Sequence, residues 1–100
     1  SAPRLDIDAL RPGEAAVGRR KGETVAAFRD EAGVLHVVSA TCTHMGCLVG
    51  WNAPDRSWDC PCHGSRFGVD GEVLHGPATA PLEATGPARP PAPSAPESPR

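Results

Sequence analysis

The sequence predicts an all-β domain built from short antiparallel strands. Short apolar segments alternate with turn signals that contain Gly, Pro, Asn or Asp, and Val34 to Ala40 is the most β-branched of these segments. Asp70-Gly71 stands between two such segments, and this dipeptide is a good hairpin signal. No segment has a sustained helical period. These features favour short strands joined by tight turns.

Turns divide the chain into its expected elements. Pro12 and Gly13 occupy the central positions that a type II turn requires. Further turns are expected at Lys21-Gly22, Asp30-Glu31-Ala32-Gly33 and Asn52-Ala53-Pro54-Asp55. The strands predicted around these turns are residues 14–20, 23–29, 34–40, 48–51, 57–59, 68–69 and 72–74.

Every cysteine, and two of the four histidines, lie in two short stretches. The first is Cys42-Thr43-His44-Met45-Gly46-Cys47, and the second is Cys60-Pro61-Cys62-His63-Gly64-Ser65-Arg66-Phe67. Each stretch brings soft thiolates and a borderline imidazole close together, so the pair can hold a metal centre between two loops. Because strands 48–51 and 57–59 lie between them, we expect the two loops at opposite ends of one hairpin.

Spacing distinguishes the kinds of metal site. A plant-type ferredoxin requires a third cysteine soon after the first pair, and no third thiol follows Cys47 at that distance. A c-type haem requires two residues between its cysteines, and Cys60-Pro61-Cys62-His63 is one residue short. A tetrahedral zinc site with two Cys and two His remains open, although it leaves two cysteines without a role.

The two stretches resemble the Rieske proteins of cytochrome bc-type complexes. In a Rieske [2Fe-2S] centre, two cysteines bind one iron and two histidines bind the other. The resemblance therefore implies that Cys42 and Cys60 hold the inner iron and that His44 and His63 hold the outer iron. It also implies a disulfide between Cys47 and Cys62. The fold that it implies is a small Rieske-type antiparallel β-sandwich with a two-loop cluster-binding subdomain.

The same resemblance assigns roles around the cluster. Ser65 matches the serine whose hydroxyl, in the family, donates to a bridging sulfide. Phe67 stands where high-potential respiratory members have a tyrosine that bonds a ligating thiolate, which argues against carrying over a quinol-oxidising role. Gly76-Pro77, with Ala78 and Pro81-Leu82 after it, is similar to the third, proline-bearing loop that covers the cluster.

A finer resemblance is to Rieske domains fused behind bacterial FAD-dependent oxidoreductases. The segments that carry it are residues 47–52, 57–60, 64–67 and 73–78. It implies one-electron transfer by a C-terminal domain that is not catalytic alone, with an upstream flavin domain or a redox protein as partner. The start at Ser1-Ala2-Pro3, without Met, agrees with such a fragment. The alternative is an independent, soluble ferredoxin-type carrier.

Bulk properties limit the remaining possibilities. The 100 residues allow one domain, which we place at 1–85, followed by a Pro-rich tail at 86–100 that we expect to be extended. A net charge of -2 with mixed signs indicates no nucleic-acid partner. No apolar run approaches the roughly 20 residues of a membrane span, and there is no signal-peptide pattern. We expect a cytoplasmic protein, while noting that a disulfide also fits an exported one.

Four further residues have expected structural roles. Trp51 and Trp58 are expected to pack in the core. His36 and His75 are expected to be surface or locally bonded histidines and not metal ligands.

Overall fold

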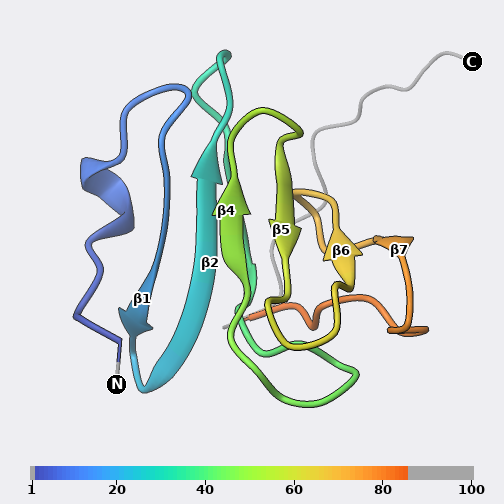
Figure 1. The fold of residues 1–100 in the computed structure, drawn as a ribbon. Helices are drawn as coiled ribbons and strands as arrows, with labels where there is room; N and C mark the ends of the chain where they lie inside the picture. The colour runs from blue at the N-terminus through green and yellow to red at the C-terminus, as the bar shows by residue number, and fades with distance from the viewer. Residues whose placement is uncertain (1, 86–100) are drawn as a thin grey trace, which may run out of the picture.

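The structure is a computed structural model that describes residues 2–85. Within them, seven strands form two antiparallel sheets. Figure 1 shows the course of the chain. The first sheet has the order β1 (Ala15–Arg20), β2 (Glu23–Arg29) and β3 (Leu35–Ser39). The second has the order β4 (Gly50–Asn52), β5 (Ser57–Asp59), β6 (Arg66–Phe67) and β7 (Val73–His75). The predicted all-β class is confirmed, and the Pro-rich tail lies outside the described residues.

The hairpin between β1 and β2 follows the predicted turn. Lys21 and Gly22 both have positive φ, 52° and 82°, as the two-residue hairpin turn that matches strand twist requires. The N-terminal segment then covers the outer edge of β1, where Leu5 N–H donates to the Arg19 carbonyl at 2.9 Å. Glycine is required at Gly18, because a Cβ there would lie 2.6 Å from the Leu5 Cβ. The edge of β1 is therefore already paired at Arg19.

A short 3-10 helix, η1 (Ile7–Ala9), which was not predicted from the sequence, precedes β1. Asp6 caps it by accepting the Asp8 N–H at 3.0 Å. The guanidinium of Arg29 holds it in place through the carbonyl of Leu10, at 2.5 Å. The helix is closed by backbone hydrogen bonds from Ala9 to Asp6 and from Leu10 to Ile7. A single turn of this kind has no period that a sequence pattern could show.

The predicted hairpin around Asp70-Gly71 is wrong in its first strand. Gly68 and Val69 are not a strand; they belong to the turn, and β6 ends at Phe67. Gly68 N–H donates to the Glu72 carbonyl at 2.8 Å, which closes a longer loop than the two-residue turn expected. The pairing of β6 with β7 also contains a register shift at Arg66/Phe67. The Asp70-Gly71 dipeptide therefore predicts the position of the turn correctly, but it does not predict the length of the loop.

Aromatic side chains join the two sheets. Trp51 of β4 stacks on Phe28 of β2 with ring centroids 4.8 Å apart, and it lies at the same distance from Trp58 of β5. Trp58 and Phe67 are fully buried. The predicted core role of both tryptophans is confirmed, since both pack in or against the buried cluster. This contact sets the position of the second sheet relative to the first.

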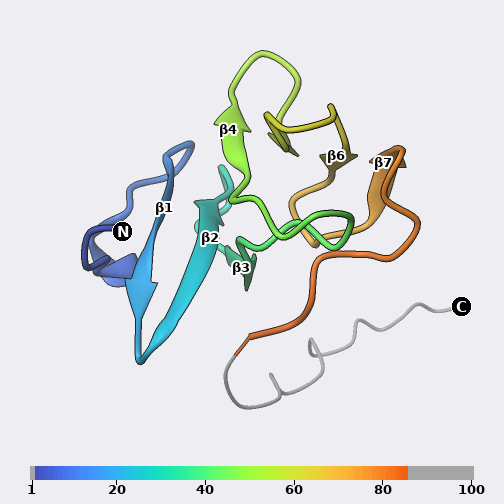
Figure 2. The same cartoon turned by 60° about the horizontal axis from the view of Figure 1, so that its bottom comes forward.

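The cysteine-containing loops do not lie at opposite ends of their hairpin, so that expectation is wrong. Gly50 pairs with Asp59, which makes the start of β4 and the end of β5 neighbours. Both loops therefore leave the hairpin at the same end, at the bottom of Figure 1. Figure 2 brings that end forward and shows the segment that follows β7 passing close to the loops. Antiparallel pairing thus brings together two stretches that the sequence separates.

Candidate metal centre

The first loop runs from Cys42 to Cys47 and is closed by its own backbone. Cys42 N–H donates to the Cys47 carbonyl at 2.8 Å, and Gly46 N–H donates to the Cys42 carbonyl at 2.9 Å. Gly46 has φ +78°, a conformation that glycine adopts without strain. The tight turn buries the Cys42 side chain and leaves His44 exposed.

The second loop repeats this hydrogen-bond pattern. Cys60 N–H donates to the Ser65 carbonyl at 2.8 Å, and Gly64 N–H donates to the Cys60 carbonyl at 3.0 Å. Gly64 has φ +82°. Cys60 is buried and His63 is exposed. The two loops therefore present the same arrangement, with a thiol inside and an imidazole outside.

A disulfide joins Cys47 in the first loop to Cys62 in the second. The Cys60 sulfur lies within 4.8 Å of both bridged sulfurs, but a disulfide sulfur is not a thiolate and does not serve as the anionic ligand of a cluster. The free thiols are Cys42 and Cys60. The structure thus leaves two thiols available for a metal, both buried.

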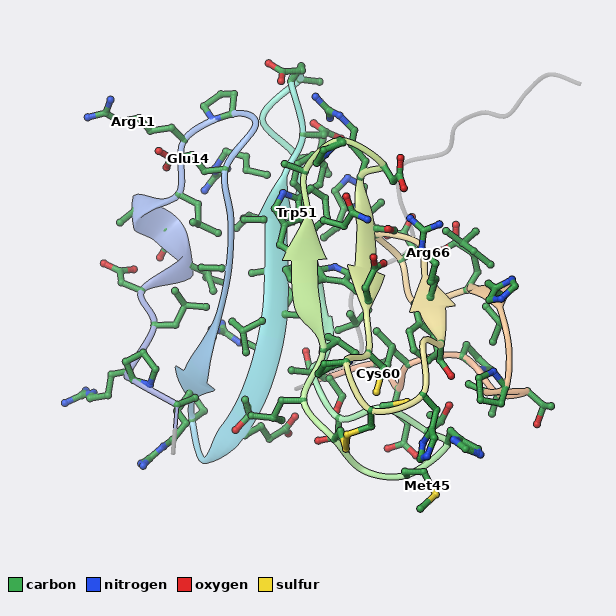
Figure 3. The ribbon with its side chains drawn as sticks, viewed as in Figure 1. Arg11, Glu14, Met45, Trp51, Cys60 and Arg66 are labelled. Atoms are coloured by element: carbon green, nitrogen blue, oxygen red, sulfur yellow. A yellow bond between two sulfur atoms is a disulfide. The ribbon has the colours of Figure 1, made fainter. Side chains whose placement is uncertain are left out.

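The two loop histidines, one on each loop, lie close to each other. The ring centroids of His44 and His63 are 5.3 Å apart, and the rings are nearly perpendicular, at 86°. Figure 3 shows Met45 at the outer tip of the loops and Cys60 deeper toward the sheet. The two imidazoles are thus exposed, whereas the Cys42 and Cys60 thiols of the same loops are buried.

The environment of Cys42 favours its thiolate. Burial opposes ionisation, but backbone N–H groups of His44 and Met45, with side-chain contacts from Cys60 and Ser65, outweigh it and lower the pKa of Cys42. The His44 N–H lies 3.4 Å from the sulfur. A thiol held this way is prepared to bind a cation, because the thiolate is the ligand form.

A third loop, residues 76–82, is bonded to both of the others. Ala78 N–H donates to Ser65 Oγ at 2.9 Å, and the Thr43 hydroxyl donates to the Ala80 carbonyl at 2.6 Å. Gly76 and Pro77 lie at the exposed start of this loop. Phe67 is fully buried in β6, where its ring offers no hydrogen bond. The predicted third loop thus lies against the other two.

A polar clamp, which was not predicted from the sequence, lies at the base of the second loop. Asp59 ends β5 immediately before Cys60, and Arg66 begins β6 immediately after Ser65. Arg66 Nε donates to Asp59 Oδ1 at 3.2 Å, and the buried Ser57 hydroxyl donates to the same oxygen at 2.7 Å.

The clamp extends to two further residues. Asn52 donates to the other oxygen of Asp59 at 2.7 Å, and Arg66 also pairs with Asp55. Burial alone raises the pKa of Asp59, but the hydrogen bonds from Ser57, Asn52 and Arg66 outweigh it and hold the pKa below its ordinary value. The opposite charges immediately flanking the second loop were the signal in the sequence.

These residues fit a Rieske [2Fe-2S] cluster. The two loops provide two buried thiols, one of them in an environment that favours the thiolate, and two exposed imidazoles whose rings lie close together. That donor set is the mixed one of a Rieske centre. Fold and site together define a small β-sheet electron-transfer domain.

Comparison with known proteins leads to the family. The Rieske [2Fe-2S] domain family matches residues 3–86, and the chain belongs to it. The chain is 51% identical over 81 residues to YhfW of Bacillus subtilis, named as a Rieske 2Fe-2S iron-sulfur protein; the match covers 81% of this chain and 16% of that protein. This chain thus corresponds to a small part of that relative's length.

Two solved structures share the fold. The plasma membrane Rieske protein PetC3 of Synechocystis has a TM-score of 0.63 and 36% identity, with 69% of this chain and 71% of that chain covered. The ferredoxin of carbazole 1,9a-dioxygenase from Nocardioides aromaticivorans has a TM-score of 0.62 and 27% identity, with 84% and 86% covered. As a Rieske domain, the chain binds a [2Fe-2S] cluster and transfers electrons through it. Among residues 2–85, no helix is long and apolar enough to cross a membrane.

Proposed function

We propose that Cys42 and Cys60 bind one iron of the cluster and that His44 and His63 bind the other. The observation that carries this assignment is that each loop contributes one buried free thiol and one exposed histidine. The rings of these two histidines lie 5.3 Å apart. When bound, the cluster supplies reversible transfer of one electron. The buried Ser65 then contacts the cluster site from the protein interior. Phe67, Gly76 and Pro77 form part of the surroundings of the site.

The histidine side is the face through which we propose electrons enter and leave. Both rings are exposed, whereas Cys42 and Cys60 are 2% and 4% exposed. Met45 and Leu48, beside the first loop, are apolar and yet 59% and 42% exposed. Exposed apolar side chains around a redox site suit brief contact with a partner protein.

We further propose that this domain, residues 1–85, works at the C-terminal end of an FAD-dependent oxidoreductase in the cytoplasm. The support for this proposal is the relative YhfW, because the 81 aligned residues cover only 16% of its length. The Rieske-like region of YhfW is therefore one part of a much longer protein. An upstream flavin domain is then the natural electron partner. The second candidate is an independent carrier. The similarity to the ferredoxin of carbazole 1,9a-dioxygenase favours it, because the match covers 86% of that ferredoxin.

The ligand assignment is tested by His44→Ala and His63→Ala, with His75→Ala as the matched control. Each loop variant should lose the visible absorbance and the electron paramagnetic resonance signal of the mixed-ligand cluster, while the control keeps both. An unchanged signal in either loop variant contradicts the assignment. Colourless wild-type protein containing zinc would instead support the structural zinc site.

The wider context is tested in the protein encoded by the full reading frame that contains this chain. If a flavin domain is the partner, the purified protein should contain FAD and cluster in equal amounts, and reduction of the flavin should be followed by bleaching of the cluster. A reading frame that encodes this domain alone, or a flavin that is reduced without any change in the cluster, rejects the fused arrangement and leaves the independent carrier.

A further inference from the structure

His36 lies between two carboxylates that belong to different parts of the fold. Its Nε2 is 2.8 Å from Asp30 Oδ2, just after β2, and its Nδ1 is 2.7 Å from Asp70 Oδ1, in the turn between β6 and β7. His36 itself lies on β3. The side chain is only 18% exposed. One imidazole therefore connects the first sheet to the second.

Both contacts need the doubly protonated ring. A carboxylate accepts hydrogen bonds and does not donate them, whereas a neutral imidazole has one donor and one acceptor nitrogen. When His36 loses its proton, one nitrogen faces Asp30 or Asp70 with a lone pair. One of the two connections must then be lost or replaced by water.

The surroundings favour the charged ring. Burial alone lowers the pKa of His36, but the hydrogen bonds and charges of Asp30 and Asp70 outweigh it and raise the pKa above its ordinary 6.5. The hydrogen bond from His36 likewise lowers the pKa of Asp30. The ring centroids of Phe28 and His36 are 6.0 Å apart. The Arg56 guanidinium lies over the other ring of this pair, 5.3 Å from the centroid of Phe28.

The turn that His36 holds supports the third loop of the metal centre. Gly71, next to Asp70, accepts the Leu82 N–H at 2.8 Å. The fit is close, because a Cβ on Gly71 would lie 2.8 Å from the Leu82 carbonyl oxygen. Leu82 is buried and ends the loop whose Ala78 N–H reaches Ser65. A displacement of the turn is therefore transmitted to the loop over the cluster.

We propose that His36 is a positioning residue for the metal centre. As an imidazolium that bridges Asp30 and Asp70, it holds the β6–β7 turn against the first sheet, and we call this three-residue bridge the clasp. Retention of the cluster then depends on the protonation of His36. The proposal rests on the cluster assignment above. Because the folded protein binds this proton more tightly than the unfolded chain, the clasp is complete below the ordinary pKa of 6.5. It is lost as pH rises through the raised pKa of His36. Retention should therefore weaken toward alkaline pH.

The experiment measures the rate of cluster release to a chelator, followed by visible absorbance, from about pH 6 to pH 9. Wild-type protein should release its cluster about three- to tenfold faster at the alkaline end, after allowance for the exposure of Asp70. His36→Gln should be fast already at pH 6 and should lack this part of the pH dependence. His75→Gln, which removes an exposed histidine outside the clasp, should follow the wild type.

Asp70→Asn provides a second test in case His36→Gln does not fold. It keeps the shape of the contact and removes one of the charges that favour the imidazolium, so the midpoint of the pH dependence should move to lower pH. A purely structural contact gives no such shift. Identical profiles for wild type, His36→Gln and Asp70→Asn overturn the proposal, and so does an Asp70→Asn midpoint equal to that of the wild type.

A nuclear magnetic resonance titration of ¹⁵N-histidine-labelled protein separates this inference from the cluster assignment. The ring of His36 should carry protons on both nitrogens at neutral pH and should titrate above the ordinary histidine range. A neutral His36 at pH 6 refutes the clasp whatever metal is bound. A doubly protonated His36 in a protein that binds no [2Fe-2S] cluster would leave the clasp intact and refute the function proposed above.

Discussion

Ser65 is the residue at which the second loop, the third loop and the Cys42 thiol meet. Its side chain is fully buried, and its Oγ accepts the Ala78 N–H at 2.9 Å. The same hydroxyl contributes to the lowered pKa of Cys42. A serine hydroxyl can accept one hydrogen bond and donate another, so Ser65 suits both tasks.

Ser65→Ala should therefore lower the reduction potential of the cluster. Loss of one hydrogen bond to a charged sulfur should lower the equilibrium constant for reduction of the cluster by about tenfold, which is about 60 mV for a one-electron couple. Protein-film voltammetry measures the shift, and Ser39→Ala, outside the three loops, is the control. A reduced melting temperature with an unchanged potential would limit Ser65 to a structural role.

Phe67 occupies a position where a single hydroxyl should tune the site. It is fully buried and pairs with Trp58 across β5 and β6. Phe67→Tyr should raise the potential by about 60 mV, since a phenol that donates to a thiolate stabilises the reduced form. The same change at Phe28 of β2 should leave the potential unaltered. If the new hydroxyl at position 67 finds no sulfur, the variant will lose about 1–3 kcal/mol of stability with no change of potential, which contradicts the prediction.

At the scale of elements, the two cluster loops are connected twice: through the proposed ligands and through the Cys47–Cys62 disulfide. Closing a loop of 15 residues is worth about 3 kcal/mol in the chain-entropy account. Part of that is redundant while a cluster bridges the same loops. The disulfide should therefore matter most when the cluster is absent.

Cys47→Ser should destabilise the apoprotein by about 3 kcal/mol and the cluster-bound protein by less. Urea unfolding of both forms gives the two values, and the half-life of the cluster should fall in parallel. Alkylation of the denatured, unreduced wild type should label the two free thiols, Cys42 and Cys60. Labelling of all four cysteines would show that the disulfide does not form in solution.

The second loop also depends on the polar clamp formed by Asp59 and Arg66. Asp59→Asn should cost about 1 kcal/mol at neutral pH, a modest value because the carboxylate is one-third exposed. The lowered pKa of Asp59 means that its contribution is present above the ordinary 3.8 and is lost as pH falls through the folded value.

The acid range therefore tests the clamp. Between about pH 5 and pH 2, the melting temperature of the wild-type apoprotein should fall more steeply than that of Asp59→Asn. Asp8→Asn, an exposed carboxylate on η1, should leave the wild-type profile unchanged. Parallel profiles for wild type and Asp59→Asn would mean that the clamp contributes nothing measurable.

At the scale of the whole molecule, Trp51 carries the contact between the sheets. Its ring lies between Phe28 of the first sheet and Trp58 of the second, 4.8 Å from each. Trp51→Ala should destabilise the domain by about 3 kcal/mol, and so lower the melting temperature by more than about 10 °C. Trp51→Phe, which keeps an aromatic ring, should lose less than half of this. Equal melting temperatures for the wild type and the alanine variant would show that the sheets are held together elsewhere.

The strands and turns of the first sheet could be predicted because their signals are local. Glu23–Arg29 and the Lys21-Gly22 turn depend on side-chain patterning and on glycine's access to positive φ. The motif of cysteines and histidines is equally local, since ligand type and spacing identify a metal site without knowledge of the fold. Even the disulfide partners followed from the family resemblance.

Other features depended on contacts between distant residues. The common end of the two loops follows from the pairing of Gly50 with Asp59, which no single stretch encodes. The end of β6 at Phe67 was set by the Gly68–Glu72 hydrogen bond and not by the Asp70-Gly71 turn signal alone.

The sequence by itself determined the fold class, the family and the residues that we propose as cluster ligands, because these depend on residue types at short spacings. Only the tertiary structure decided which polar side chains support the site. His36 meets Asp70 at 2.7 Å although 34 positions separate them along the chain. Such a contact exists only after the two sheets have packed, and its strength depends on the burial and charge that packing creates.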